Sequence, residues 1–153
     1  MHRRSLLWGV FSAVGAAFAA SRANAATEAA PPIKPQEKLK VVYHLSDADK
    51  VSFVLGNIQN HLDGVGGPDH VTIALVIHGQ ALRAFPSASA NPDLSKRVSQ
   101  FSKAGLELAV CGNTMKSQNV TLKDLLPGLV AAERGGVVRI AEPQSQGYLY
   151  LRP

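Results

Sequence analysis

The sequence predicts an α/β fold in which a mainly parallel sheet is flanked by helices on both faces. Three apolar segments, residues 39–45, 70–79 and 106–111, have the length and the β-branched content of buried strands. Between them, apolar residues recur every three or four positions over a dozen residues or more, which is the spacing of helices. This alternation is the βαβ pattern, whose crossovers are right-handed and whose strands run parallel.

The first half of the predicted domain contains two strands and one helix. Residues 39–45, LKVVYHL, form the first strand, and residues 46–49 provide a helix-capping signature with acidic residues in the first turn. The following helix ends at the glycines of residues 64–68. Its apolar face consists of Val51, Val54, Leu55, Ile58 and Leu62. Residues 70–79 are apolar almost throughout, so we expect this strand to be covered on both faces and central in the sheet.

The second half begins with a loop over residues 79–90 that leads to a second helix. This helix opens at Asn91-Pro92, places Leu94, Val98 and Phe101 on one face and ends at Gly105. The third strand, residues 106–111, precedes a short helix at residues 114–119. We then expect a helical turn within 120–128, a short strand within 129–133, a helix at 136–141 that Pro143 ends or kinks, and an edge strand within 147–153.

The N-terminal residues have the features of an export signal. Arg3 and Arg4 precede an apolar run, and Ala23-Asn24-Ala25 matches a small-residue cleavage site. The run is shorter than the ~20 residues of a membrane-spanning helix. We therefore expect a cleavable signal at residues 1–25, a flexible Pro-rich linker at 26–38 and one α/β domain at 39–153. The expected location is periplasmic or secreted, by Sec or twin-arginine export, with no membrane association after cleavage.

The charge balance gives no indication of a nucleic-acid partner. The precursor has 16 basic and 11 acidic residues, and removal of Arg3, Arg4 and Arg22 with the signal leaves 13 basic residues and a net charge of +2. The high isoelectric point is therefore largely a property of the signal. Cleavage after Ala25 leaves 128 of the 153 residues, which suits a single domain.

The predicted strand ends place several reactive side chains at one edge of the sheet. His44 lies at the end of the first strand, His78 at the end of the second and Cys111 at the end of the third. Parallel strands share one carboxyl edge, where open α/β sheets bind ligands, so we expect these side chains to lie close together. Gly112 and Asn113 follow at a helix start, where free backbone N–H groups favour a thiolate.

Cys111 is the only cysteine in the chain, so it is buried, paired between chains or reactive. A helix dipole contributes about 0.3–1 kcal/mol, less than the ~1.36 kcal/mol of one pKa unit. A direct N–H contact or a histidine neighbour is therefore needed to keep the thiol ionised at neutral pH. The alternative is that Cys111 is a small apolar side chain ending a buried strand, with His44 and His78 as hydrogen-bonded rim residues.

Several familiar motifs are missing from the sequence. There is no C-x-x-C for dithiol chemistry, no G-x-S-x-G elbow, and the glycines of residues 64–67 follow a helix and precede a strand, the reverse of a dinucleotide-binding turn. We expect no organic cofactor and no resident metal. The one metal alternative is a soft site for copper, in which Met115 would join Cys111 and a rim histidine.

Four segments carry a family resemblance over about residues 39–153: KVVYHLSD, VTIALVIHG, GLELAVCGNTMKSQNV and QGYLYLRP. Together they resemble the DsrE/DsrF-like family, also called YchN-like. The resemblance implies a three-layer α/β sandwich that assembles as a trimer or hexamer. In sulfur-relay members the cysteine matched by Cys111 accepts sulfane sulfur as a persulfide and passes it to a partner protein. Those members are cytoplasmic hetero-oligomers, whereas this chain carries an export signal.

The leading hypothesis is an exported sulfur-handling protein, a sulfurtransferase-like carrier acting through Cys111 alone. Its partners would be a sulfur donor and acceptor thiol proteins. His78 and His44 would raise the thiolate fraction or bind an anionic donor, whose oxygens would meet the N–H groups of Gly112 and Asn113. The alternatives are a copper or other soft-metal binding module and a non-catalytic oligomeric interaction module.

Overall fold

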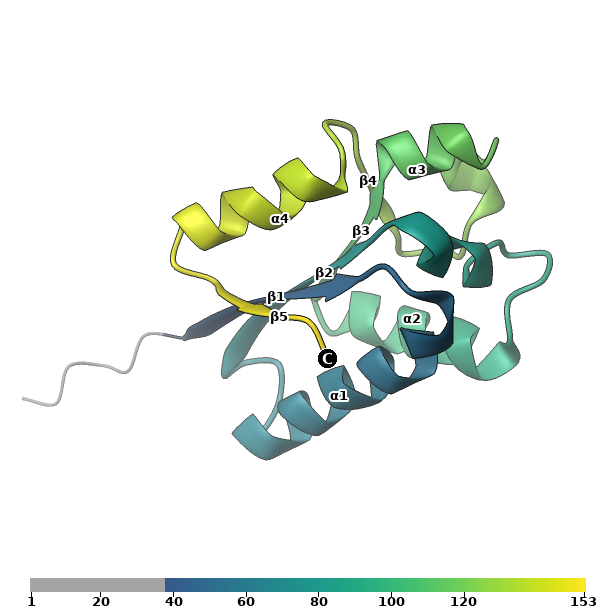
Figure 1. The fold of residues 1–153 in the computed structure, drawn as a ribbon. Coiled ribbons are helices and arrows are strands. Elements are labelled where there is room, and N and C mark those ends of the chain that lie inside the picture. The colour runs from purple at the N-terminus through teal and green to yellow at the C-terminus, as the bar shows by residue number, and fades with distance from the viewer. Residues whose placement is uncertain (1–37) are drawn as a thin grey trace, which may run out of the picture. The chain divides into compact units, whose positions relative to one another are not determined.

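The computed structural model describes residues 38–153, and these form an α/β domain around a five-stranded sheet (Figure 1). The expected signal at residues 1–25 and nearly all of the expected linker lie outside the described residues. The strands are β1 (Leu39–Leu45), β2 (Val71–Ile77), β3 (Glu107–Cys111), β4 (Val130–Ala132) and β5 (Leu149–Leu151). They pair in the order β4-β3-β2-β1-β5, and every pair is parallel. The predicted parallel sheet is confirmed, with β2 at its centre and β5 at one edge.

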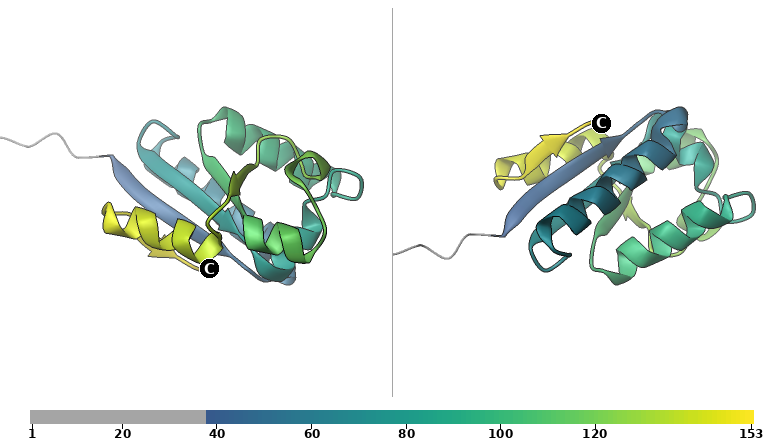
Figure 2. Two further views of the ribbon diagram at one scale, coloured as in Figure 1. Left: turned by 90° about the horizontal axis from the view of Figure 1, so that it is seen from above. Right: turned by 90° about the horizontal axis from the view of Figure 1, so that it is seen from below.

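Helices cover both faces of this sheet, as predicted. They are α1 (Val51–Val65), α2 (Pro92–Lys103), α3 (Gly112–Ser117) and α4 (Gly136–Ser145), with 3-10 turns η1 (Ala48–Lys50), η2 (Gly79–Ala84) and η3 (Leu122–Asp124). Figure 2 shows α1 and α2 together on one face and α4 on the other. No helix within residues 38–153 is long and apolar enough to cross a membrane.

The face beneath α1 and α2 contains the main hydrophobic core. The apolar faces predicted for both helices are buried there, together with alternate residues of β1, β2 and β3. Phe101 and Ile77 are among the most completely buried side chains. Each side chain of this size contributes about 1.5–3 kcal/mol when fully buried, so most of the apolar stabilisation lies on this face.

The opposite face has a smaller apolar cluster under α4. Val42, Ala74, Val76 and Ile140 form it, and Tyr148 packs against them. Beside this cluster, Arg139 of α4 donates two hydrogen bonds to the carboxylate of Glu107 at the start of β3. One helix therefore covers this face with few apolar contacts, and Val137 in its first turn remains 74% exposed.

The structure corrects four details of the predicted elements. Residues 46–49 do not cap the first helix, because a 3-10 turn precedes α1 and the carboxylate of Asp47 pairs with Arg152. Residues 79–90 begin with the helical turn η2 instead of a plain loop. The helix after β3 starts at Gly112, two residues before the predicted position, since Cys111 itself is its N-cap. Finally, Pro143 does not end α4, which continues to Ser145.

Pro143 is tolerated because it lies in the last turn and its ring is buried. A proline removes one helical N–H, here the one that would bond to the carbonyl of Arg139. The carbonyl of Pro143 accepts hydrogen bonds from the N–H groups of Gln146 and Tyr148, at 2.9 Å and 3.0 Å. These bonds close the helix and turn the chain into β5.

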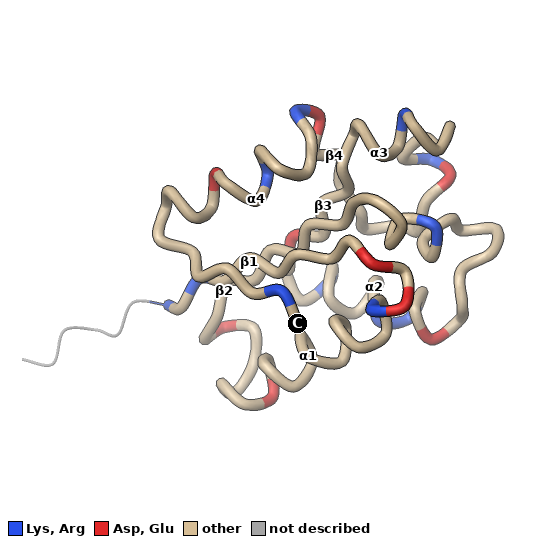
Figure 3. Tube along the Cα trace, viewed as in Figure 1, with Lys and Arg blue, Asp and Glu red and all other residues tan. Residues whose placement is uncertain are grey.

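Charged residues of both signs are interspersed over the described part of the chain (Figure 3). The described ion pairs join Arg134 to Glu142, Arg139 to Glu107 and Arg152 to Asp47. Arg152 and Asp47 come from opposite ends of the domain sequence and meet beside the carboxyl edge of the sheet. This edge is also where the candidate site lies.

Candidate functional site

The carboxyl edge of the sheet brings Cys111 and His78 side by side. In the parallel pairing of β2 with β3, Ile77 is opposite Val110, so His78 and Cys111 are the next residues along. An added Cβ on Gly136 would lie 3.2 Å from Cβ of Cys111 and 3.3 Å from Cβ of His78. Both side chains therefore lie under the first residue of α4, on the same face of the sheet.

The thiol of Cys111 is surrounded by hydrogen-bond donors. Burial raises its pKa, but hydrogen bonds from the hydroxyl and N–H of Thr114 and from the N–H groups of Gly136 and Asn113 outweigh that effect. The pKa of Cys111 is therefore lowered from its ordinary value. The direct N–H contacts that the sequence argument required are present, whereas no histidine is among the groups that lower this pKa. The residue as a whole is buried, with 7% of its surface exposed.

Two helix starts supply these donors. Cys111 is the N-cap of α3, and the N–H groups of Asn113 and Thr114 in the first turn of α3 are among the groups that lower its pKa. Gly136 begins α4 and adds a donor from the other side of the sulfur. A side chain at Gly136 would crowd the thiol, since its Cβ would lie 3.5 Å from Sγ of Cys111. Glycine thus permits the close approach of α4 to the sulfur.

Thr114 connects the thiol to the end of β2. Its Oγ1 accepts a hydrogen bond from the N–H of Gly79 at 3.1 Å, so the hydroxyl proton is available to the sulfur of Cys111. The carbonyl of Gly79 in turn accepts a hydrogen bond from the side-chain amide of Gln118 at 2.8 Å. This network fixes the orientation of the Thr114 hydroxyl relative to the thiol.

Gly112 and Asn113 differ in what they do beside the thiol. An added Cβ on Gly112 would lie 3.1 Å from the carbonyl oxygen of Ala132, so this glycine allows α3 to pack against the end of β4. The N–H of Asn113 is directed at the sulfur of Cys111. Of the two backbone N–H groups expected at the site, only that of Asn113 is among the donors that lower the thiol pKa.

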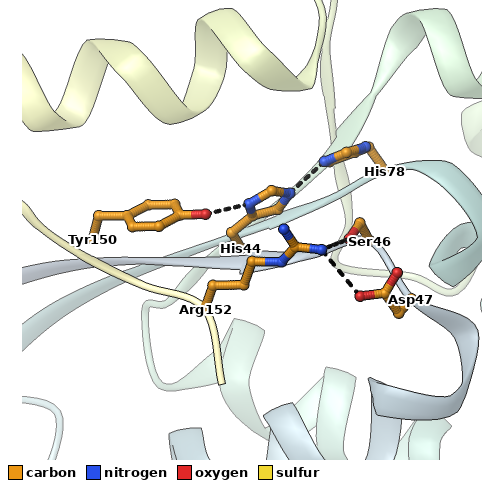
Figure 4. Close-up of polar contacts among 6 residues, drawn as sticks. All are labelled: His44, Ser46, Asp47, His78, Tyr150 and Arg152. Carbon is orange, nitrogen blue, oxygen red and sulfur yellow. Dashed lines mark hydrogen bonds and ion pairs between the residues drawn. The ribbon is translucent and has the colours of Figure 1, made fainter.

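His44 and His78 contact each other at the centre of the same edge (Figure 4). The two Nε2 atoms are in contact, the ring centroids are 4.6 Å apart and the planes differ by 23°, so the rings meet edge to edge. Nδ1 of His44 lies 2.6 Å from the hydroxyl of Tyr150 on β5. The structure therefore joins Tyr150, His44 and His78 in one chain of hydrogen bonds.

Both imidazoles are neutral at neutral pH. Burial, then the charges of His78 and Arg152, lower the pKa of His44 from 6.5 to about 4, against the opposing effect of Asp47. Burial and Arg152 lower the pKa of His78 as well, again against Asp47. Arg152 itself donates hydrogen bonds to Oγ of Ser46 at 3.1 Å and to the carboxylate of Asp47 at 3.2 Å.

A small open pocket of about 300 Å³ adjoins His44 on the α4 face. Its lining is mainly apolar and comes from α4 and β5: Val137, Ile140, Ala141, Gln144 and Tyr150. Val137 follows Gly136 directly, so this pocket begins one residue away from the contact with the thiol. It offers room for a small group next to the histidine pair.

Met115 does not lie with the histidines. Its side chain is buried in the core cluster beneath α1 and α2. The copper alternative therefore loses its thioether ligand. Within residues 38–153 there is also no group of three or more His, Cys, Asp or Glu side chains placed to hold a metal ion.

Sequence reasoning missed Gly136, Thr114, Tyr150 and Arg152. Gly136 could have been suspected because a Gly-Gly pair directly precedes a helix start. Thr114 lies within the segment GLELAVCGNTMKSQNV, which carries part of the family resemblance. Tyr150 and Arg152 could be placed beside His44 only once the last strand was paired with β1.

Fold and site together define a class of protein: an α/β domain with a single cysteine, of lowered pKa, at the carboxyl end of a parallel strand. The chain belongs to the DsrE/DsrF-like family, whose family model matches residues 15–153. This family is associated with sulfur relay.

Two solved structures show the same fold. A protein of unknown function from Methanobacterium thermoautotrophicum, MTH1491, is 26% identical, with a TM-score of 0.65, and the match covers 75% of this chain and 99% of that one. The ychN protein from E. coli is 9% identical, with a TM-score of 0.60, and the match covers 75% of this chain and 100% of that one. Comparison with curated proteins gives no match.

Proposed function

We propose that this protein carries sulfane sulfur as a persulfide on Cys111. The observation that supports this role is the set of donors around one sulfur, contributed by Thr114, Asn113 and Gly136, which lowers the pKa of the thiol. A thiolate is the reactive form in exchange with sulfur–sulfur bonds. Membership of a family associated with sulfur relay points to the same chemistry.

The proposed step is a displacement at sulfur. The thiolate of Cys111 attacks the outer sulfur of a sulfane donor, a new S–S bond forms to Cys111, and the old S–S bond breaks with its electron pair on the donor fragment. The thiolate of an acceptor protein then attacks the outer sulfur of the persulfide and regenerates Cys111. Neither step needs a metal or an organic cofactor.

The same donors would stabilise the persulfide product. A persulfide anion carries its charge mainly on the outer sulfur, and the donors of Asn113, Thr114 and Gly136, which surround the inner sulfur, would act on this charge across one S–S bond. Because Cys111 is only 7% exposed, the outer sulfur would be the atom that reaches a partner. We further propose that the mature protein acts outside the cytoplasm after signal cleavage, as a homo-oligomer.

The test is intact mass of the freshly reduced mature protein after anaerobic incubation with thiosulfate or polysulfide. We expect the wild type to gain one sulfur atom that a thiol reductant removes, which excludes sulfinic acid. Cys111→Ser should gain none. Equal gain in both proteins would refute the proposal, and copper retained stoichiometrically by the wild type but not by Cys111→Ser would favour the metal-binding alternative.

Two further measurements examine location and assembly. Mass analysis of the exported protein should show an N-terminus at Ala26, and a full-length chain kept in the cytoplasm would contradict export. Light scattering of the mature protein should give a trimer or hexamer. A monomeric mass would contradict the proposed assembly while leaving the chemistry of Cys111 intact.

A further inference from the structure

Sulfur transfer to Cys111 releases a fragment of the donor, and this fragment needs a proton. The role of that proton depends on the proposed function, on which this inference rests. When the thiolate attacks an alkyl persulfide, RS–SH, the products are Cys–S–SH and RS⁻. The thiol formed from RS⁻ has a pKa of about 8.5, so below that pH the fragment takes up a proton to become RSH. A proton donor positioned at the thiol would speed this step.

His78 is the titratable side chain beside the thiol. It is next to Cys111 across the β2–β3 pair, and a Cβ added to Gly136 would lie 3.2 Å from Cβ of Cys111 and 3.3 Å from Cβ of His78. The N–H of His78 donates to the carbonyl of Leu45 at 3.0 Å, which fixes the backbone at the end of β2. Since its Nε2 contacts His44, the nitrogen of His78 left for other partners is Nδ1.

Nε2 of His78 is connected to the exposed surface through a chain of hydrogen bonds. Two sets of neutral tautomers satisfy these contacts, and in one of them the Tyr150 hydroxyl donates to Nδ1 of His44 and Nε2–H of His44 donates to Nε2 of His78. His78 then carries its proton on Nδ1. Tyr150 is 41% exposed, so the far end of this chain exchanges protons with water.

We propose that Tyr150, His44 and His78 form a proton relay that delivers a proton from solvent to the fragment displaced by Cys111. His78 gives its Nδ1 proton to RS⁻ and receives a proton on Nε2 from Nε2 of His44. His44 receives the Tyr150 proton on Nδ1, and the phenolate takes a proton from water. One proton moves from water to RSH, and each ring ends neutral as the opposite tautomer.

The surroundings of the pair favour neutral rings, which a relay of this kind requires. Arg152 lies near both imidazoles and disfavours their cationic forms, Asp47 partly offsets it, and burial acts in the same direction as Arg152. The α4 residues that line the pocket beside His44 carry no charge: Val137, Ile140, Ala141 and Gln144. A neutral imidazole can donate at one nitrogen while it accepts at the other.

The test compares two probes that differ in whether the displaced fragment needs a proton. Glutathione persulfide releases an alkyl thiolate, whereas methyl methanethiosulfonate releases a sulfinate that is stable as an anion. Rates are measured by mass spectrometry for wild type, Tyr150→Phe and His44→Gln. Tyr148→Phe, which removes a nearby hydroxyl outside the hydrogen-bonded chain, is the matched control.

We expect Tyr150→Phe and His44→Gln to react with the persulfide about a hundredfold more slowly than wild type, at the lower end of the range typical of general acid catalysis. Their rates with methyl methanethiosulfonate should stay within about twofold, because the thiolate itself is unchanged. In the wild type, deuterated solvent should slow only the persulfide reaction. Tyr148→Phe should match the wild type with both probes.

Three results would overturn the relay in different ways. If the wild type gains no sulfur from the persulfide yet reacts with methyl methanethiosulfonate, the proposed function fails and the relay fails with it. If the wild type gains sulfur and both variants do so at the same rate, the relay alone is wrong. Equal slowing of both probes would mean that these residues only support the structure around the thiol.

Discussion

The two faces of the sheet have different roles, because one contains the main apolar core and the other contains the candidate site. The face under α1 and α2 is filled by a large, continuous apolar core, whereas the face under α4 has a four-residue apolar cluster and the titratable groups Cys111, His44 and His78. The same strands supply both faces, because successive residues of a strand point in opposite directions. Substitution of strand residues that point toward α1 and α2 should therefore change the stability. Substitution of strand residues that point toward α4 should change the candidate site.

The largest expected effect is a loss of stability on substitution in the face under α1 and α2, here called the stable face. Phe101→Ala removes a side chain that is 1% exposed and should lower the free energy of unfolding by about 3–5 kcal/mol, because it leaves a cavity. Val137→Ala on the α4 face, where the side chain is 74% exposed, should change it by less than about 0.5 kcal/mol. Urea denaturation measures the free energy of unfolding of both variants. Similar losses in the two variants would show that both faces contribute equally to stability.

The next effect concerns the contact between α4 and the thiol. In Gly136→Ala the new Cβ would lie 3.2 Å from Cβ of Cys111 and 3.3 Å from that of His78, so α4 must shift. We expect a loss of about 1–3 kcal/mol and a higher thiol pKa as the N–H donor moves away. Denaturation measures the loss of stability, and the pH dependence of iodoacetamide alkylation measures the thiol pKa.

Gly56→Ala is the matched glycine control. Gly56 lies within α1, and an added Cβ would meet nothing within 4 Å. This variant should be more stable by about 0.5–1 kcal/mol through helix propensity, with an unchanged thiol pKa. If Gly136→Ala behaved in the same way, the close packing of α4 on Cys111 would be unimportant.

A smaller effect is expected at Thr114. Thr114→Val removes the hydroxyl that donates to Cys111, a hydrogen bond worth about 0.5–1.5 kcal/mol, so the thiol pKa should rise by up to about one unit. Thr114→Ser should retain the low value. Alkylation rates between pH 6 and pH 9, a range of about three units around an ordinary thiol pKa, distinguish the two variants. Identical profiles would assign the low pKa to the backbone donors alone.

A separate effect is a pH dependence of stability on the α4 face. The pKa of His44 is about 4 in the folded protein and 6.5 ordinarily, so between these values the unfolded chain binds the proton more readily. Stability should therefore fall as the pH falls from about 6.5 to about 4. His44→Gln should flatten this slope in urea titrations at several pH values, and an unchanged slope would place its origin elsewhere.

The sequence predicted the stable face almost completely. The apolar residues of α1, from Val51 to Leu62, and those of α2, from Leu94 to Phe101, are the ones found buried. Helical spacing specifies such residues directly, because a helix face that must meet a sheet has to be apolar. The nearly continuous apolar run of β2 likewise predicted its central position.

The α4 face was predicted only in outline. The strand ends placed His44, His78 and Cys111 at one edge, but the partners that define their chemistry come from distant segments. Gly136 and Tyr150 reach this edge through the crossover from β4 to β5, and their contacts depend on strand pairing that local patterns do not encode. The capping signature at residues 46–49 was wrong for the same reason, since the partner of Asp47 is Arg152, which follows β5.

The position of β5 beside β1 has a consequence for how the protein folds. The imidazole of His44 and the hydroxyl of Tyr150 are separated by 106 residues, whereas β1, β2 and β3 associate in chain order. Contacts between remote segments are costly in loop entropy and tend to form late. During folding, the sulfur of Cys111 would therefore be accessible to oxidants until α4 docks on the sheet. The rate at which this last crossover forms would set how long the thiol stays exposed.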